Sequence, residues 1–196
     1  MSSLPKSALC AALIYDDYHV PAMFRPWAQV LLERAALRPG ERVLDLACGS
    51  GVVARLAIYQ VGSQGQVSAL DLNPAMLEVA RSHEDSHEAE SPGIAWTNGS
   101  ALDLPFAESA FDTMLCQQGF QFFPDPGLAL AEIRRVLSPG GRVLLLVSQA
   151  IERNPLYHRL NQAMLARTGI PAYAAPFTMG QPGCLPGRIA VGRWIP

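Results

Sequence analysis

Apolar residues along this chain occur either in short continuous runs or at spacings of three to four residues. The continuous runs predict strands at 42–46, 66–70, 94–97, 111–116 and 142–148. The helically spaced runs predict helices at 24–37, 52–61, from 74 onward, at 128–137 and at 156–167. Continuous apolar strands that alternate with helices are typical of a parallel sheet covered on both faces. The pattern therefore predicts an α/β protein with a doubly wound, mostly parallel sheet.

The composition indicates one packed domain. Of the 196 residues, 49% are hydrophobic and 16% are charged. This supplies enough apolar material for one core, and the chain is too short for two full domains. No apolar run reaches the ~18 residues that a membrane-spanning helix needs. We therefore expect no membrane span.

Charge and cysteine usage narrow the expected partners and compartment. The formal net charge of −2 gives no electrostatic reason to expect nucleic acid as a partner. The four cysteines, Cys10, Cys48, Cys116 and Cys184, show no paired spacing, which is typical of reducing compartments. A cytoplasmic protein that binds small molecules is the expectation.

The end of the chain differs in composition from its body. The first 152 residues contain ten basic and 17 acidic residues, a net charge of −7, whereas the last 44 contain five arginines and no acid. From Gly169 onward, ten of 28 residues are glycine or proline. We divide the chain into an N-terminal helical or lid segment (1–38), a main domain (39–168) and an atypical tail (169–196).

A glycine-rich turn after the first predicted strand is the candidate ligand site. Gly49 and Gly51 allow the backbone to turn sharply and to approach a ligand. The helix that starts near Gly51 points free N–H groups at that ligand. Asp71 lies 22 residues after Gly49, at the end of the next strand, where a carboxylate can bind both hydroxyls of a ribose. We therefore expect a ligand that contains a ribose.

Five ordered blocks of sequence extend this turn over about residues 40–148. They are VLDLACGSG at 43–51, LDLNPAML at 70–77, GSALDLPF at 99–106, FDTM at 111–114 and RVLSPGGR at 135–142. Together they resemble class I S-adenosylmethionine-dependent methyltransferases of the ubiquinone/menaquinone-biosynthesis-like (type 11) group. The resemblance implies a single-domain Rossmann-like sheet whose residues 39–168 bind S-adenosylmethionine. It also implies methyl transfer to a small-molecule acceptor by in-line displacement, with S-adenosylhomocysteine as a product.

The resemblance further implies which residues contact the cofactor. The first block would face its amino-acid end, Asp71 its ribose, the third block its adenine, and the residues after the fourth strand its methionine portion. The implied residues are Asp45, Ala47, Cys48, Gly49, Gly51, Asp71, Leu72, Met76, Ser100, Ala101, Leu102, Gln117 and Gln118. Structural roles stay open for some of them: core packing for Leu72 and Met76, and capping of the turn for Asp45.

Two positions depart from the family pattern. Ala47 stands where the family has the first glycine of the turn. Ser100 stands where the family has an acid, so the adenine amino group loses a strong acceptor. Asp103 lies three residues further along and is a candidate replacement. The departures bear on cofactor affinity and leave the identity of the cofactor unchanged.

Methyl transfer requires the enzyme mainly to align the acceptor and to exclude water. A general base helps when the acceptor is a hydroxyl or an acidic carbon. Two candidates are His19, in a segment at 15–19 that could cover the pocket, and His158 on the last predicted helix. Each could equally be an ordinary surface histidine. The aromatic stretch 120–123 is a candidate wall for the acceptor, or packing beneath the following turn.

Two other enzyme classes share parts of the pattern. GSGVVA at 49–54 fits the dinucleotide fingerprint G-x-G-x-x-A, so an NAD(P)-dependent oxidoreductase is an alternative. Such an enzyme is not expected to carry the Leu-Pro-Phe and Pro-Gly-Gly blocks. Residues 83–87 match the H-E-x-x-H signature of zinc proteases. Their polar flanks favour a solvated helix end, so we expect no metal site.

Members of the resembled family close the sheet with two further strands, and we expect this chain to end before them. Only 188–191 has the pattern of a short strand. A truncated chain would leave the fifth strand as an exposed edge, which predicts a homodimer through that edge or a disordered tail. It also keeps open a second function, that of a cofactor-binding but catalytically impaired methyltransferase.

Overall fold

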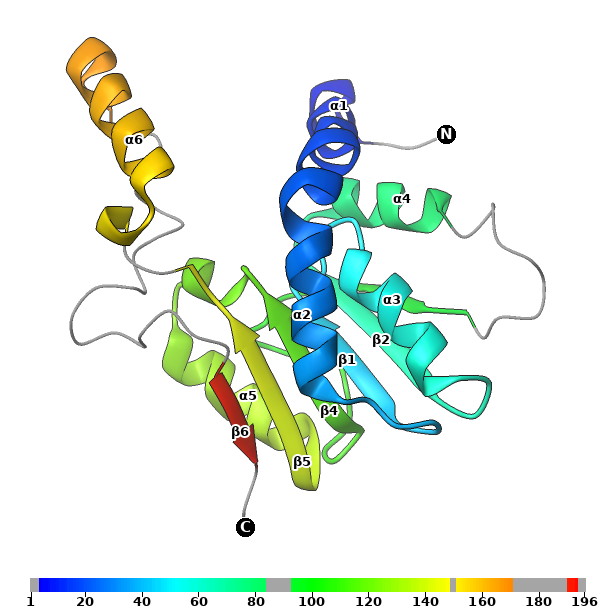
Figure 1. Ribbon diagram of the computed structural model, residues 1–196. Coiled ribbons are helices and arrows are strands. Elements are labelled where there is room, and N and C mark those ends of the chain that lie inside the picture. The colour runs from blue at the N-terminus through cyan, green and yellow to red at the C-terminus, as the bar shows by residue number, and fades with distance from the viewer. Residues whose placement is uncertain (1–3, 84–92, 149–150, 171–189, 194–196) are drawn as a thin grey trace.

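The computed structural model describes residues 4–83, 93–148, 151–170 and 190–193 (Figure 1). These residues contain a six-stranded sheet in the order β3-β2-β1-β4-β5-β6. Strands β1 to β5 are parallel, which confirms the predicted doubly wound α/β sheet, and β6 is antiparallel to β5. The strands are β1 (Arg42–Leu46), β2 (Gln66–Asp71), β3 (Ala95–Asn98), β4 (Phe111–Gln117), β5 (Leu137–Leu146) and β6 (Ala190–Arg193).

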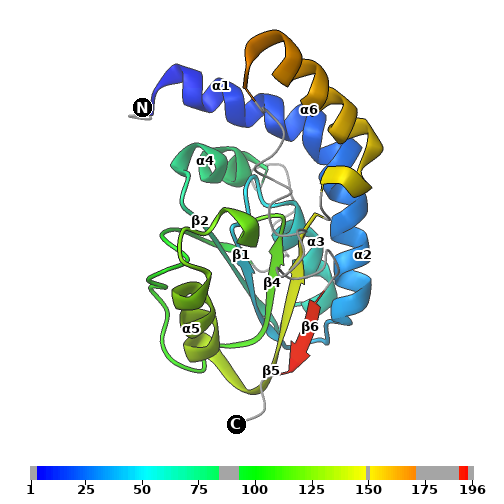
Figure 2. The same ribbon diagram turned by 90° about the vertical axis from the view of Figure 1, so that its left-hand side faces the viewer.

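Helices cover both faces of the sheet because successive side chains of a strand point to opposite sides. Within β1, Val43 packs into the core formed with α2 (Arg25–Ala35) and α3 (Val52–Val61). The next residue, Leu44, packs into the core formed with α5 (Pro126–Val136). Figure 2 shows α5 on one side of the sheet and α2 and α3 on the other. The continuous apolar runs are therefore strands buried on both faces.

Two helices precede α2 that the hydrophobic pattern does not predict. The first, α1 (Lys6–Ile14), packs against α4 (Pro74–Ser82) through Ala12 and Ala75. The second, η1 (Tyr15–Phe24), is a π-helix that continues directly into α2. Neither has an apolar stripe of helical period, so periodicity could not find them. No helix among the described residues is long and apolar enough to cross a membrane.

One short helical element directly follows β4, and two follow β5. The 3₁₀ turn η3 (Phe120–Phe122) directly follows β4, and η4 (Ile151–Arg153) precedes α6 (Pro155–Thr168). The last of these confirms the predicted helix at 156–167. In Figure 1, α6 stands away from the sheet.

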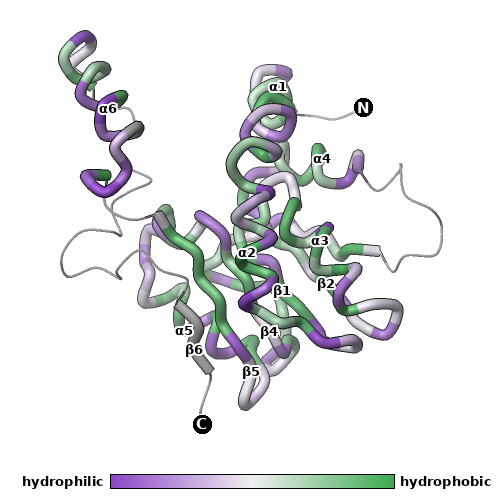
Figure 3. Tube along the Cα trace, in the orientation of Figure 1, coloured by the Kyte–Doolittle hydropathy of each residue, from purple (hydrophilic) through white to green (hydrophobic). Residues whose placement is uncertain are grey.

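Strand β5 begins before the position predicted for it. Leu137 pairs with Phe111, whereas the next ladder partner of β4, Thr113, pairs with Arg142. The Pro-Gly-Gly block therefore forms a bulge inside the strand. Gly140 in this bulge has φ +80°, a value that glycine adopts readily. After Arg142, β5 is hydrophobic to its end at Leu146 (Figure 3).

The outer edge of β5 is paired, contrary to the expectation of an exposed edge. Strand β6 pairs with β5 from Arg142↔Arg193 to Leu145↔Ala190. A short segment of the tail therefore supplies the backbone partners that an open edge lacks. One of the closing strands expected to be absent is present, and the expected homodimer loses the open edge on which it rested. The tail residues 171–189 and 194–196 lie outside the described residues.

Candidate active site

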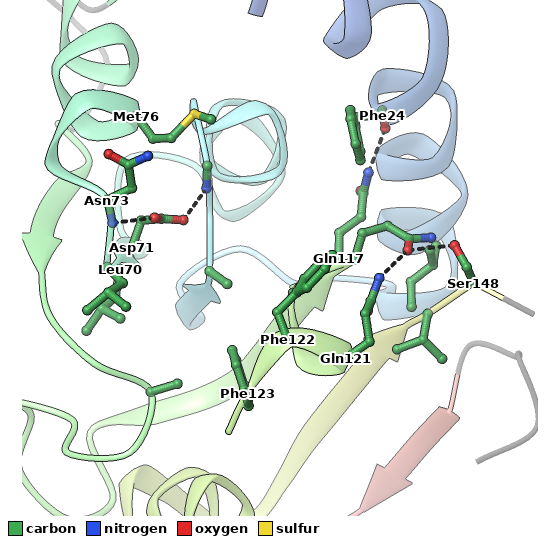
Figure 4. A pocket seen from close by; sticks show the side chains of 18 of the residues that line it. Phe24, Leu70, Asp71, Asn73, Met76, Gln117, Gln121, Phe122, Phe123 and Ser148 are labelled. Atoms are coloured by element: carbon green, nitrogen blue, oxygen red, sulfur yellow. Dashed lines mark hydrogen bonds between the residues drawn. The ribbon is translucent and has the colours of Figure 1, made fainter. Parts of the chain in front are cut away.

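A pocket of about 920 Å³ lies at the carboxyl ends of β1, β2 and β4 (Figure 4). This volume is within the range of small-molecule sites. Open α/β sheets bind ligands at this edge, where the strand order reverses, and here the order reverses between β1 and β4. The helices η1 and α2 form the opposite wall of the pocket through Tyr15, Phe24 and Trp27. The pocket therefore lies where the sequence predicts a ligand.

Most of the predicted cofactor residues line this pocket, although they come from distant turns of the chain. Those that line it are Ala47, Gly49, Asp71, Leu72, Met76, Ser100, Ala101, Leu102, Gln117 and Gln118. Asp45, Cys48 and Gly51 do not line it. Asp45 is part of β1, and Cys48 and Gly51 belong to the turn that follows it, so the contacts of these three residues with the cofactor stay predictions.

The turn after β1 depends on residues with positive φ. Ala47, Gly49 and Gly51 have φ values of +57°, +56° and +85°. A Cβ added to Gly51 would lie 2.3 Å from Cη2 of Trp96, a distance that no real contact reaches. At Gly49 the nearest atom to such a Cβ would be the hydroxyl oxygen of Tyr15, at 3.6 Å. Gly51 is therefore required by packing as well as by backbone conformation, which explains its place in the motif.

Asp71 is held in position at the end of β2 by backbone donors. Its Oδ2 accepts the N–H of Gly49 at 2.8 Å, and its Oδ1 accepts the N–H of Asn73 at 2.8 Å. The amide of Asn98 donates to the carbonyl of Asp71 at 2.9 Å. Each carboxylate oxygen can accept a second hydrogen bond. The carboxylate is therefore oriented in advance and keeps the capacity to bind two hydroxyls.

Asp45 faces the interior of the protein. It is 1% exposed, and its Oδ2 accepts the N–H of Ala54 in α3 at 2.9 Å. Burial raises the pKa of this carboxyl from 3.8 to about 7. This geometry agrees with the structural role, in which Asp45 holds the turn after β1. Its contact with the ammonium of the cofactor stays a prediction.

The raised pKa predicts a specific effect of Asp45→Asn on stability. Between pH 4 and 7 the unfolded chain ionises this carboxyl while the folded protein keeps it protonated, so the wild type loses stability as pH rises. The loss is about 3 kcal/mol between pH 4.5 and 8, and stability is constant above about pH 7. Asparagine can still accept from Ala54 but does not titrate. Urea unfolding at pH 4.5 and at pH 8 should show that the free energy of unfolding of D45N, taken relative to the wild type, rises by about this amount from the lower pH to the higher. The exposed variant D17N should follow the wild type, and an unchanged pH dependence in D45N would contradict the prediction.

Gln117 at the end of β4 connects the sheet to the opposite wall. Its Nε2 donates to the carbonyl of Phe24 at 2.8 Å. Its Oε1 is buried and has no hydrogen-bond partner among the described residues. An unpaired buried amide oxygen is costly. The contact of Gln117 with the methionine portion of the cofactor stays a prediction.

The predicted adenine loop contributes neutral groups. Ser100 accepts the N–H of Leu102 on its Oγ at 3.1 Å, so this backbone donor is already paired within the loop. Asp103 is exposed and does not line the pocket. The structure therefore gives no sign that Asp103 replaces the acid that Ser100 lacks.

The charge of the pocket distinguishes two cofactors. Among the described lining residues, Asp71 is the only charged side chain, and no lysine or arginine is present. The pyrophosphate of NAD(P) would bring two negative charges without a cationic partner. The sulfonium and ammonium groups of S-adenosylmethionine are cations, which an aspartate attracts. The described pocket therefore fits S-adenosylmethionine better than a dinucleotide.

Neither candidate base lines the pocket. His19 is exposed and stacks on Tyr15, with ring centroids 5.9 Å apart. His158 is on α6, where its Nε2 lies 3.0 Å from Nε2 of Gln162. The structure therefore does not bring either imidazole into the cavity, and their catalytic role stays a prediction.

Of the residues of the zinc-protease signature, only His83 lies among the described residues. The Nε2 of His83 lies 2.7 Å from Oδ2 of Asp16 on η1. Glu84 and His87 lie outside the described residues. No group of three metal-binding side chains was found among the described residues. The histidine that can be placed links α4 to η1.

The segment 15–19, which we expected to cover the pocket, supplies one lining residue. Tyr15 reaches the glycine turn from η1, and burial raises the pKa of its hydroxyl. Trp27, Gln121 and Tyr157 also line the cavity. The aromatic residues concentrated between Tyr15 and Trp27 were the available signal. As one reading of the stretch 120–123 proposed, Phe122 and Phe123 do line the pocket.

Comparison with known proteins identifies the family. The family model described as "ubiE/COQ5 methyltransferase family" matches residues 20–169. A 2-phytyl-1,4-naphtoquinone methyltransferase of Synechococcus elongatus is 38% identical over 167 residues, which are 84% of this chain and 71% of that protein. The ubiquinone/menaquinone biosynthesis C-methyltransferase of Legionella pneumophila is 38% identical over 120 residues, 61% of this chain and 48% of that protein. The second match thus spans about half the length of the relative.

Solved structures show the same fold. An S-adenosylmethionine-dependent methyltransferase from Aquifex aeolicus superimposes with a TM-score of 0.55 at 21% identity, covering 60% of this chain and 62% of that chain. An arsenic(III) S-adenosylmethionine methyltransferase from Chlamydomonas reinhardtii superimposes with a TM-score of 0.54 at 29% identity, covering 71% and 47%. Fold, pocket charge and sequence agree. The chain belongs to the ubiE/COQ5 methyltransferase family, and it is a methyltransferase that uses S-adenosylmethionine as its cofactor.

Proposed function

We propose that this enzyme methylates a ring carbon of a hydroquinone that carries an isoprenoid chain. The observation that carries the proposal is one continuous pocket, which extends from Asp71 to an aromatic wall that includes Trp27, Phe122 and Phe123. Aromatic side chains of this kind bind a flat apolar ring well. The relatives from Synechococcus and Legionella, a phytyl-naphtoquinone methyltransferase and a C-methyltransferase, support the same acceptor class.

The pocket residues divide naturally between the two ligands. Asp71 would bind the ribose hydroxyls, and Met76 and Leu72 would cover the adenine. Leu72 is 73% exposed in the structure, so an adenine against it would bury apolar surface. Gln117 would accept from the ammonium of the cofactor. The aromatic wall and the glutamines after β4 are then left for the acceptor.

The proposed reaction needs no oxidant or reductant. When bound, S-adenosylmethionine supplies the methyl group on a sulfonium sulfur, and the neutral thioether S-adenosylhomocysteine is the leaving group. A bond forms between the methyl carbon and the ring carbon as the bond from methyl to sulfur breaks, and the ring carbon then loses its proton to solvent. The acceptor must be the electron-rich hydroquinone, because the ring of a quinone is itself electrophilic. The protein holds the two partners in line and excludes water.

A pair of soluble acceptors tests this proposal. Under anaerobic reducing conditions, 2-prenyl-1,4-naphthohydroquinone and S-adenosylmethionine should give the 3-methyl product and one equivalent of S-adenosylhomocysteine. The matched compound 2-methyl-3-prenyl-1,4-naphthohydroquinone, whose ring carbon is blocked, should give none. Methylation of the blocked compound would show transfer to oxygen and would contradict the proposal.

The transfer assay together with a binding measurement distinguishes an active enzyme from the catalytically impaired alternative. Calorimetric binding of S-adenosylhomocysteine without transfer to either acceptor would favour a protein that binds the cofactor and does not use it on this substrate class. The expected result is binding together with transfer to the unblocked acceptor alone.

A further inference from the structure

The start of η1 covers the turn after β1 with an aromatic ring. Tyr15 lines the pocket, and its hydroxyl oxygen and Cζ lie 3.6 and 3.9 Å from the position of a Cβ on Gly49. The centroid of the Tyr15 ring is 5.9 Å from that of His19 and 5.0 Å from that of Phe24, both in the same segment. Contacts within one helix cannot hold that helix against the turn, so other side chains must do so.

The next residue, Asp16, connects η1 to two other helices. Its Oδ2 lies 2.7 Å from Nε2 of His83, the C-cap residue of α4, and its Oδ1 lies 3.8 Å from Nη2 of Arg55 in α3. Arg55 also donates from its Nη1 to the carbonyl of Ser50 in the glycine turn. The carboxylate of Asp16 therefore links η1, through one arginine, to the turn that Tyr15 covers.

The contact between Asp16 and Arg55 is largely removed from solvent. The two side chains are 9% and 18% exposed. Burial lowers the pKa of the Arg55 guanidinium, and the nearby Asp16 carboxylate opposes that shift. Charges in such positions are weakly screened, and removing one of them leaves the other without compensation. Asp16 is not among the described residues that line the pocket, so it acts on a ligand through the residues that it holds in place.

We propose that Asp16 is a positioning residue, which holds Tyr15 over the glycine turn and thereby closes this side of the cofactor site. The inference rests on the cofactor and does not depend on the identity of the methyl acceptor. Without the charge of Asp16, η1 is held less firmly against α3 and α4, and the ring of Tyr15 covers Gly49 in a smaller fraction of molecules. The affinity for a ligand falls in proportion to the fraction that is competent to bind it. His83, the first residue of the H-E-x-x-H pattern, is then an anchor for η1.

Titration calorimetry of the intact protein with S-adenosylhomocysteine tests the inference. Asp16→Asn keeps the size of the side chain and removes its charge. Its dissociation constant should rise about tenfold, which corresponds to a fall in the competent fraction to about one tenth. Asp17→Asn removes the same charge from an exposed neighbouring position, and its dissociation constant should stay within about twofold of the wild-type value. Urea unfolding shows whether each variant is folded under the conditions of the titration.

A double-mutant cycle identifies the route by which Asp16 acts. Tyr15→Ala removes the ring and should weaken the binding of S-adenosylhomocysteine at least as much as D16N does. In the Y15A background, D16N should weaken binding further by less than about twofold, because no ring is left to be positioned. A merely structural role of Asp16 would give the same loss in both backgrounds, and that result would overturn the inference.

A second variant keeps the test decisive if D16N does not fold. His83→Ala removes one partner of Asp16 at a partly exposed helix end and leaves the contact with Arg55. Its dissociation constant should rise about threefold in the wild-type background and stay unchanged in the Y15A background. An unchanged dissociation constant in D16N, or in H83A where D16N does not fold, would overturn the inference while leaving the proposed function intact.

Discussion

Replacing Asp71 with asparagine is expected to weaken the binding of S-adenosylhomocysteine by about 100-fold. The carboxylate accepts the N–H groups of Gly49 and Asn73 on separate oxygens. Asparagine has one acceptor oxygen, so its NH₂ group must face one of these donors, and the carboxylate's capacity to accept two ribose hydroxyls is lost. Loss of two charge-assisted hydrogen bonds of about 1.5 kcal/mol each corresponds to roughly this factor.

Titration calorimetry of D71N against the wild type measures this effect. Asp17→Asn is the matched control, because Asp17 is exposed and does not line the pocket. Its affinity should stay within about twofold of the wild type. Urea unfolding of D71N separates a binding defect from a loss of folded protein. A change in the dissociation constant of D71N of less than about threefold would show that the ribose is bound elsewhere.

Replacing Gly51 with alanine is expected to destabilise the protein by about 3–4 kcal/mol. Two costs combine at this position. A residue other than glycine at φ +85° costs about 1–2 kcal/mol. The new Cβ would also lie 2.3 Å from Cη2 and 2.7 Å from Cζ3 of Trp96, and such overpacking costs about 1–3 kcal/mol. The indole is a rigid ring packed against the core, so it cannot move aside as the end of a flexible side chain would.

Gly40→Ala isolates the backbone cost. Gly40 has φ +84°, but no atom lies within 4 Å of the Cβ position, so this variant should lose only about 1–2 kcal/mol in urea unfolding. In a Trp96→Leu background, the further cost of G51A should fall to the same value, because the ring atoms have been removed. Equal losses for G51A and G40A in the wild-type background would show that Trp96 does not press on the turn.

The hydrophobic pattern was sufficient to locate the central sheet. Runs such as 42–46 and 52–61 were assigned with the bounds that the structure has for β1 and α3. Strands buried on both faces leave an unbroken apolar run, and the flanking glycines mark where each run ends. The same reasoning missed α1 and η1, because neither concentrates its apolar residues on one side.

The pattern of a short strand at 188–191 overlaps β6, but the pairing of this segment with the outer edge was not predictable from the pattern. The strand β6 has only four residues, Ala190–Arg193, and follows a tail rich in glycine and proline. Its partner on β5 lies about 50 positions earlier in the chain. A segment this short has little strand signal of its own, and its stability depends on the backbone groups of the neighbouring strand.

The sequence by itself determined the local chemistry of the cofactor site. Gly49 and Gly51 mark positive φ values that other residues adopt at a cost, and Asp71 follows a strand that parallel topology brings beside the first. The tertiary structure alone decided which of these groups line the pocket. It turned Asp45 into the core, because the N–H of Ala54 lies there to meet its carboxylate.

The acceptor side of the pocket was likewise decided by the tertiary structure. Trp27, Gln121 and Tyr157 come from three separate segments and have no common spacing. They line one cavity because residues of α2, α6 and the turn after β4 meet at the same pocket. Backbone conformations that depend on single residues can therefore be predicted from the sequence. A cavity formed by side chains from distant segments can be identified only when the packing of those segments is known.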